Sequence, residues 1–211
     1  MRVKICGITK LEQGRAIVNL GATALGFICT NKSPRYIKPA SIKSIISQLP
    51  KQVDRVGVFV NSSISEISQV VKEANLTAVQ LHGDESVEFC QQLRQNLPEI
   101  ELIKAISVKT KASLEVVTAY TNCVHTLLLD AYHPNLRGGT GKSINWEILK
   151  QFKPSLPWLL AGGLTPDNII DAIETTEPNG IDLSSGVERS PGDKDLDKVA
   201  QLFAKLKKYL D

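Results

Sequence analysis

Short apolar runs recur along the chain, and each is followed by a segment in which apolar residues repeat at helical spacing. Several of these runs are continuously apolar, which is typical of parallel strands that are covered on both faces. The pattern therefore predicts eight strands, at residues 3–6, 24–29, 55–60, 78–82, 102–106, 126–130, 158–161 and 181–183.

Helix starts are marked by capping residues and by proline. Ser63 followed by Glu66 predicts a capping box before the apolar helical pattern of residues 64–74. Pro166 follows a threonine and Pro191 follows a serine, so we expect each proline at the first position of a helix. The remaining polar segments are expected to be loops, at residues 31–40, 107–113 and 132–143.

Eight strand–helix units in 211 residues predict an α/β fold, a (β/α)₈ TIM barrel of parallel strands with little added structure. We expect residues 1–211 to form a single barrel domain. The alternative is an open, doubly wound sheet. However, no Gly-x-Gly-x-x-Gly fingerprint follows the first strand, and the glycine-rich turns come late in the chain, where barrels bind phosphate.

Composition and charge exclude several classes of protein. Hydrophobic residues make up 42% of the chain and charged residues 22%, which is ordinary for a globular protein and excludes extensive disorder. A net charge of +3 is too small to indicate a nucleic-acid partner. No apolar run approaches the roughly 20 residues of a membrane span, and no signal peptide precedes the first strand. We therefore expect a cytoplasmic protein with no membrane partner and with reduced cysteines.

Two predicted strands end in side chains that can transfer protons. The first strand ends at Cys6, and the sixth, which contains three leucines, ends at Asp130. Active sites of such barrels lie at the carboxyl ends of the strands, so these residues are candidates for a base and an acid facing one pocket. The alternatives are that Cys6 is a small buried apolar residue and that Asp130 is a helix cap or a solvated loop residue.

Glycine-rich turns follow the seventh and eighth predicted strands. The first turn contains Gly162 and Gly163, and the second contains Ser184, Ser185 and Gly186. A phosphate can approach backbone N–H groups closely where no side chain intervenes, so two such turns at adjacent strand ends predict a phosphate site. The alternative is that these glycines only turn the chain.

A third glycine-rich segment, at residues 137–143, ends in Gly-Lys-Ser like a nucleotide P-loop. That motif requires a glycine where this chain has Leu136. We interpret the segment as a mobile lid over the rim of the barrel and not as a nucleotide site.

Three further polar side chains are candidates for substrate binding. His82 ends the fourth predicted strand, and Asp182 lies on the same strand face as Ser184. Arg35 lies in a predicted loop. Each also has a structural interpretation: His82 as a hydrogen-bonded rim histidine, Asp182 as a residue that holds a loop, and Arg35 as a solvated arginine.

These motifs occur together and in a characteristic order: Val3-Lys4-Ile5-Cys6-Gly7-Ile8-Thr9, Ser33-Pro34-Arg35-Tyr36, Gln80-Leu81-His82-Gly83, Leu129-Asp130 with Gly138-Gly139-Thr140-Gly141, Leu160-Ala161-Gly162-Gly163-Leu164 and Asp182-Leu183-Ser184-Ser185-Gly186-Val187-Glu188. From the first strand to the last helix, the chain resembles the phosphoribosylanthranilate isomerases of tryptophan biosynthesis. The resemblance implies a (β/α)₈ barrel that performs an Amadori rearrangement without metal or organic cofactor. The substrate would be N-(5-phosphoribosyl)anthranilate, a phosphosugar carrying an anthranilate group, and the product 1-(2-carboxyphenylamino)-1-deoxyribulose 5-phosphate. Both a monomer and a homodimer are compatible with the sequence.

Position by position, the resemblance implies that Cys6 is the general base, Asp130 the general acid and Arg35 the partner of the anthranilate carboxylate. The two glycine-rich turns would bind the phosphate. Residues 29–32 depart from the aromatic pair usual in the family, which leaves the packing around the anthranilate ring open. A free thiol has a pKa of about 8.5, so a nearby cation is needed to form the thiolate. We hypothesise that Lys4, on the same strand face as Cys6, supplies it with help from Arg35.

Two other classes fit the same residues. One is another sugar-phosphate barrel enzyme, such as indole-glycerol-phosphate synthase, the histidine-pathway isomerase or a pentose-phosphate epimerase. The histidine-pathway enzyme would carry aspartate in place of Cys6, and an epimerase would need more metal-binding histidines than the three in this chain. The other class is a noncatalytic phosphate-binding barrel.

Overall fold

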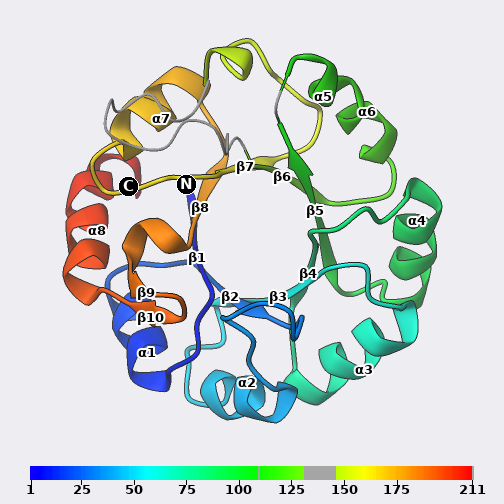
Figure 1. Cartoon of the computed structure of the whole chain (residues 1–211), viewed down its shortest axis with the longest axis horizontal. Helices are drawn as coiled ribbons and strands as arrows, with labels where there is room; N and C mark the ends of the chain where they lie inside the picture. The colour runs from blue at the N-terminus through cyan, green and yellow to red at the C-terminus, as the bar shows by residue number, and fades with distance from the viewer. Residues whose placement is uncertain (109, 131–145, 211) are drawn as a thin grey trace.

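Eight parallel strands close into a barrel in the computed structural model, which describes residues 1–108, 110–130 and 146–210 (Figure 1). Each strand pairs with its neighbours in the chain, and the first pairs with the last to close the barrel. The (β/α)₈ prediction is confirmed, and each predicted strand agrees with an observed one to within one residue at either end. The strands are β1 Arg2–Cys6, β2 Ala24–Ile28, β3 Asp54–Phe59, β4 Ala78–Leu81, β5 Glu101–Ser107, β6 Thr126–Asp130, β7 Trp158–Ala161 and β8 Gly180–Leu183.

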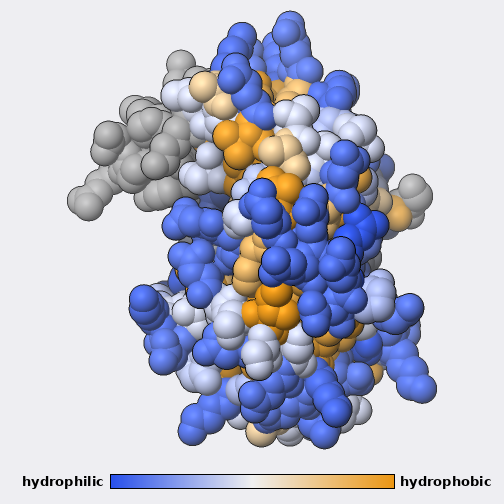
Figure 2. All heavy atoms as spheres, turned by 90° about the vertical axis from the view of Figure 1, so that its right-hand side faces the viewer, coloured by the Kyte–Doolittle hydropathy of each residue, from blue (hydrophilic) through white to orange (hydrophobic). Residues whose placement is uncertain are grey.

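Helices surround the barrel, and the face that carries α4 is covered mainly by polar side chains with apolar patches between them (Figures 1 and 2). None of the helices in the described ranges is both long enough and apolar enough to cross a membrane. Short 3₁₀ helices occur at η1 Trp146–Ile148 and η2 Ser185–Val187. The α-helices are α1 Leu11–Asn19, α2 Pro39–Ile46, α3 Ile64–Ala74, α4 Val87–Asn96, α5 Ala112–Glu115, α6 Val117–Tyr120, α7 Ile169–Thr176 and α8 Leu196–Leu210.

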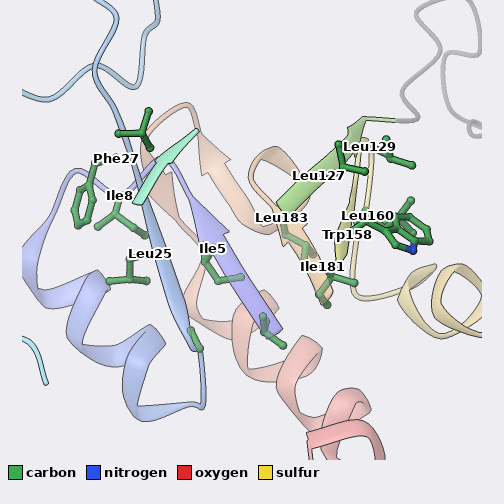
Figure 3. Packing of buried hydrophobic residues seen from close by; sticks show 14 of the residues in the cluster. Ile5, Ile8, Leu25, Phe27, Leu127, Leu129, Trp158, Leu160, Ile181 and Leu183 are labelled. Atoms are coloured by element: carbon green, nitrogen blue, oxygen red, sulfur yellow. The ribbon is translucent and has the colours of Figure 1, made fainter. Parts of the chain in front are cut away.

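The strands are apolar on both faces because each face packs against a different layer. Outward-facing residues such as Ile5, Leu127 and Leu160 belong to the large cluster between the strands and the helices (Figure 3). Inward-facing residues form a second cluster that fills the barrel, composed of Ala24, Val56, Ala78, Ile103, Ala105, Leu128, Leu159 and Ala161. Because this interior is filled, the chemistry is confined to the ends of the strands.

The predicted helix start at Pro166 is wrong. Pro166 lies in a turn, and α7 begins only at Ile169. The turn is held by the side-chain oxygen of Asn168, which accepts a hydrogen bond from the N–H of Thr165 at 2.8 Å. A proline has a fixed φ that suits a turn as well as a first helical turn, so the sequence signal fits both structures.

The helix start predicted at Pro191 is also wrong. Pro191 and Gly192 form the turn of a small antiparallel hairpin, β9 Glu188–Ser190 and β10 Asp193–Lys194. Gly192 has a φ of 81°, which favours glycine, and α8 begins at Leu196. The hairpin lies beside α1 and beside β1, the strand that ends at Cys6 (Figure 1). The wrong prediction at Pro191 therefore affects the surroundings of the candidate site.

Two further sequence predictions have different outcomes. The capping box is confirmed: Ser63 Oγ accepts from the N–H of Glu66, and the Glu66 carboxylate accepts from the N–H of Ser63 at 2.8 Å. The proposed lid at residues 137–143 lies outside the described residues.

Replacing the capping serine should lower the free energy of unfolding. Ser63→Ala removes the acceptor for an N–H of the first turn of α3, and we expect a loss of about 1 kcal/mol in urea denaturation. The matched control is Ser65→Ala, an exposed serine in the same turn that should change stability by much less. Equal losses in the two variants would show that the cap contributes nothing specific.

Candidate active site

A pocket of about 340 Å³ opens at the carboxyl ends of the strands, and all ten candidate residues from the sequence line it. They come from loops and strand ends that are far apart in the chain. The lining consists of Cys6, Arg35, His82, Asp130, Gly162, Gly163, Asp182, Ser184, Ser185 and Gly186, together with Ile28, Ser33, Val58, Gln80, Ala161, Leu164 and Leu183.

The alternation of side chains along the strands explains why Cys6 and Asp130 reach the pocket. Ile5 and Leu129 pack outward against helices, so the next residue on each strand points inward. Cys6 is 6% exposed, whereas the side chain of Asp130 is 30% exposed. The thiol and the carboxylate thus line the same pocket, the thiol buried and the carboxylate partly accessible.

The thiol of Cys6 fits closely against the neighbouring strand. Gly26 is its register partner on β2, and a Cβ at Gly26 would lie 2.6 Å from the Cys6 sulfur. Glycine is therefore required for the thiol to occupy this position. Burial raises the pKa of Cys6, and the nearby ammonium groups of Lys4 and Lys194 oppose this effect.

Lys4 and Asp182 form a buried ion pair beneath the pocket. They are register partners on β1 and β8, and Lys4 Nζ lies 2.8 Å from Asp182 Oδ2. In the part of the chain that the structure describes, the other oxygen of Asp182 is buried without a hydrogen-bond partner, as is the side-chain oxygen of Gln80. Buried acceptors are normally satisfied, so these two oxygens are suited to accept hydrogen bonds from a ligand's hydroxyl groups.

His82 is oriented by its neighbours toward Asp130. The side-chain nitrogen of Gln80 lies 2.9 Å from His82 Nδ1, and because it can only donate, the ring proton is assigned to Nε2. His82 Nε2 then faces the carboxylate of Asp130 at 3.8 Å. The loop after β4 that follows His82 is held by a buried ion pair between Lys104 and Glu85, at 2.9 Å.

The two glycine-rich turns lie in direct contact. Gly162 and Gly163 have φ values of 94° and 63°, which favour glycine. A Cβ at Gly186 would lie 1.8 Å from the carbonyl oxygen of Leu164, so the turns could not approach this closely with any other residue. The N–H groups of Ser185 and Gly186 begin η2 and therefore have no partner within it. Ser185 and Gly186 line the pocket beside the first turn.

Arg35 enters the pocket from the loop after β2 and is held by Glu188. The guanidinium donates from Nε and Nη2 to the Glu188 carboxylate at 2.6–3.1 Å. Glu188 also pairs with Lys194 at 2.8 Å, and both of these side chains are buried. Lys194 could not be predicted as part of the site from the sequence, because a lysine in a short polar segment carries no signal of burial. For Glu188, the one signal in the sequence is its position at the end of the second glycine-rich motif, two residues after Gly186.

Within residues 1–108, 110–130 and 146–210, no group of three or more His, Cys, Asp or Glu side chains is arranged to hold a metal ion. The absence of a metal or cofactor from the reaction stays a prediction.

Comparison with known proteins gives one consistent family. A family model described as N-(5'phosphoribosyl)anthranilate (PRA) isomerase matches residues 3–205. A protein of Gloeothece citriformis named N-(5'-phosphoribosyl)anthranilate isomerase is 61% identical over 209 residues, covering 99% of this chain and 95% of the relative. These matches extend over nearly the whole barrel, including every strand that contributes to the pocket.

Solved structures agree with this result. The crystal structure of phosphoribosyl anthranilate isomerase from Thermotoga maritima has a TM-score of 0.90 and 39% identity, with 99% of each chain covered. A phosphoribosyl anthranilate isomerase in complex with reduced 1-(o-carboxyphenylamino)-1-deoxyribulose 5-phosphate has a TM-score of 0.87 and 37% identity, again with 99% of each chain covered. As the sequence motifs indicated, the chain belongs to the N-(5'-phosphoribosyl)anthranilate isomerase family and is an isomerase of tryptophan biosynthesis.

Proposed function

We propose that this protein converts N-(5-phosphoribosyl)anthranilate to 1-(2-carboxyphenylamino)-1-deoxyribulose 5-phosphate with Cys6 as general base and Asp130 as general acid. The observation that carries the assignment of roles is that the inward-facing thiol of β1 and carboxylate of β6 line one pocket together with two glycine-rich turns. Family membership supports the reaction, and the pocket geometry supports the residues.

The rearrangement requires one acid and one base. The acid gives a proton to the ring oxygen of the ribose as the C1–O bond breaks, while the lone pair of the anthranilate nitrogen forms a C=N bond to C1. The base then removes the proton from C2. The electrons of the broken C2–H bond form the C1=C2 double bond of an enolamine. The C2 hydroxyl then loses its proton and C1 gains one, so that the enolamine becomes the ketone. Positioned groups on either side of the sugar are sufficient for both transfers.

The order of strands around the barrel supports these positions. Strands β7 and β8 lie between β6, which carries Asp130, and β1, which carries Cys6. The glycine-rich turns that follow β7 and β8 therefore lie between the acid and the base along the rim. A phosphate bound there to N–H groups would place the attached sugar between the two side chains.

The remaining polar groups fit the rest of the substrate. Glu188 holds the guanidinium of Arg35 through Nε and Nη2, which leaves Nη1 directed away from this pair for the anthranilate carboxylate. The buried free oxygens of Asp182 and Gln80 are suited to accept hydrogen bonds from the sugar hydroxyls. His82 lies beside Asp130, where it can contact the leaving oxygen or the anthranilate group.

Removing either proton-transfer group should abolish turnover without unfolding the protein. We expect Cys6→Ala and Asp130→Asn each to lower kcat by at least about 10²-fold, because general acid–base catalysis contributes this much or more. The assay follows the loss of anthranilate-derivative fluorescence with substrate made in situ and a chelator present, and circular dichroism checks the fold. Cys90→Ala and Asp84→Asn, outside the pocket, are the matched controls. A near-normal rate in either site variant removes that residue from the mechanism.

Lys4 should lower the pKa of Cys6, because a positive charge favours the thiolate. Lys4→Met should therefore raise the pKa of Cys6 by about one unit or more, and alkylation of the thiol should require a higher pH. The measurement is alkylation of Cys6 against pH, followed by peptide mass spectrometry without substrate. Lys72→Met, on the exposed face of α3, is the control. If a folded Lys4→Met protein has the same alkylation profile as the wild type, Lys4 does not act on the thiol.

Separating the two glycine-rich turns should weaken phosphate binding. In Gly186→Ala the new Cβ collides with the backbone of Leu164, so the turns must move apart. We expect KM to rise by about tenfold or more, equivalent to about 1.4 kcal/mol of binding free energy, with a parallel loss of inhibition by inorganic phosphate. Gly14→Ala in α1, where an added Cβ meets only ordinary contacts at 3.5 Å, is the control. Unchanged phosphate inhibition in Gly186→Ala would rule out this site.

A further inference from the structure

Behind Cys6 the structure contains a buried lysine from the small β9–β10 hairpin. Lys194 is fully buried, and its Nζ donates hydrogen bonds to the carbonyl oxygen of Cys6 and, at 3.4 Å, to that of Ser184. The same ammonium pairs with Glu188 Oε1 at 2.8 Å. One cation thus joins the strand end that carries the thiol to the turn that follows β8.

The backbone of Lys194 is also held in place. The side chain of Gln13 in α1 accepts from the N–H of Lys194 and donates to its carbonyl oxygen, both at 3.0 Å. Because backbone and ammonium are both anchored, the position of the charge relative to Cys6 is well defined. Such double anchoring is expected where a side chain has to support a catalytic group accurately.

Gly7 lies between the pocket and the buried cluster formed by Lys194, Glu188 and the end of β1. Gly7 directly follows Cys6 and has a φ of 83°. A Cβ there would lie 2.8 Å from Arg35 Cδ, 3.4 Å from Ser184 Oγ and 3.5 Å from Lys194 Nζ. Three polar side chains from different parts of the chain therefore converge on the residue after the thiol, and Ser184 Oγ donates to the carbonyl oxygen of Cys6 at 3.1 Å.

The hairpin does not need Lys194 merely to stay attached. Asp193, the preceding residue, pairs with Lys10 at 2.7 Å and with Arg189 at 3.0 Å, and it accepts from Gln13 at 2.8 Å. The contacts with Lys10 and Gln13 hold the hairpin from its solvent side, whereas the pair with Arg189 lies within the hairpin. A second, buried cation would cost desolvation energy without adding much to this attachment.

We propose that Lys194 is a positioning residue that acts through Cys6 and the phosphate turn, with Glu188 as the counter-ion that couples it to Arg35. This role rests on the proposed function above. The ammonium fixes the end of β1 against the β8 turn and supplies positive charge beside the thiol. Glu188 balances that charge and orients the guanidinium of Arg35 toward the pocket, so that one carboxylate serves both cations.

The electrostatics of the cluster agree with this role. Burial would raise the pKa of Glu188, but hydrogen bonds from Arg35 and Lys194 outweigh it and lower the pKa below its usual value. Burial lowers the pKa of Lys194, and the contact with Glu188 opposes this. Besides Lys194, the charged groups that act on the thiol are Lys4 and Asp182, from β1 and β8, and Arg35 and Cys29 also interact with it.

The test uses two variants whose effects on Cys6 have opposite signs. Lys194→Met removes a positive charge and should raise the pKa of Cys6 by about one unit. Glu188→Gln leaves the charge of Lys194 unbalanced and, in the pH range where Lys194 stays protonated, should lower that pKa. Alkylation of Cys6 against pH is followed by peptide mass spectrometry without substrate. Burial raises the pKa of Cys29 to about 12, and peptide mass spectrometry separates alkylation of this neighbouring thiol from alkylation of Cys6.

Kinetics and a matched control complete the experiment. Lys194→Met should also lower kcat/KM by about tenfold or more and weaken inhibition by inorganic phosphate, since both the thiol and the turn lose their support. Lys10→Met removes an ion pair from the outer side of the same hairpin and should leave the Cys6 pKa and the kinetics unchanged.

The possible outcomes decide whether Lys194 positions Cys6 or only holds the hairpin in place. An unchanged Cys6 pKa in folded Lys194→Met, an equal shift in Lys10→Met, or shifted pKa values with normal kinetics would each overturn the positioning role. If Lys194→Met does not fold, Glu188→Gln decides: the absence of a downward shift overturns the proposal. Because alkylation needs no substrate, failure of the wild type to turn over would refute the proposed function separately from these results.

Discussion

Closure of the barrel between β1 and β8 is the constraint on which the site depends. The closing register pairs Lys4 with Asp182, and the same pairing brings the ammonium and the carboxylate into a buried ion pair at 2.8 Å. Breaking a buried pair by removing one partner typically costs about 3–5 kcal/mol, so this contact specifies the register as well as the charge beneath the pocket. With another register, Cys6 and the turn after β8 would not meet.

The environment of the thiol is a balance between burial and charge. Gly26 allows the sulfur to pack tightly against β2, and the resulting loss of water disfavours the thiolate. Lys4 and Lys194 oppose this from two directions, one within the barrel and one from the added hairpin. The Cys6 thiol, the proposed base, therefore lies in a dry, closely packed position and still has cations that can support its charge.

The proposed acid and the proposed phosphate site have a different character. The side chain of Asp130 is partly exposed beside His82, so a ligand that enters the pocket can contact its carboxylate directly. The glycine-rich turns offer backbone N–H groups and contact each other through Gly186. Strand ends thus hold the two side chains proposed to transfer protons, whereas the turns between them are the proposed site for the anion.

The sequence by itself determined the strands and the capping box, and it identified ten of the residues that line the pocket. Strands and helices can be predicted because each leaves its own local spacing of apolar residues in the sequence. The motifs stand at strand ends, which the barrel brings together. Only the tertiary structure decided the turns at Pro166 and Pro191, because proline fits a turn and a helix start equally well. It also decided the partners of Arg35 and the burial of Lys194. Contacts between residues more than 150 positions apart leave no local pattern, and a buried lysine looks like an exposed one until the chain around it has folded.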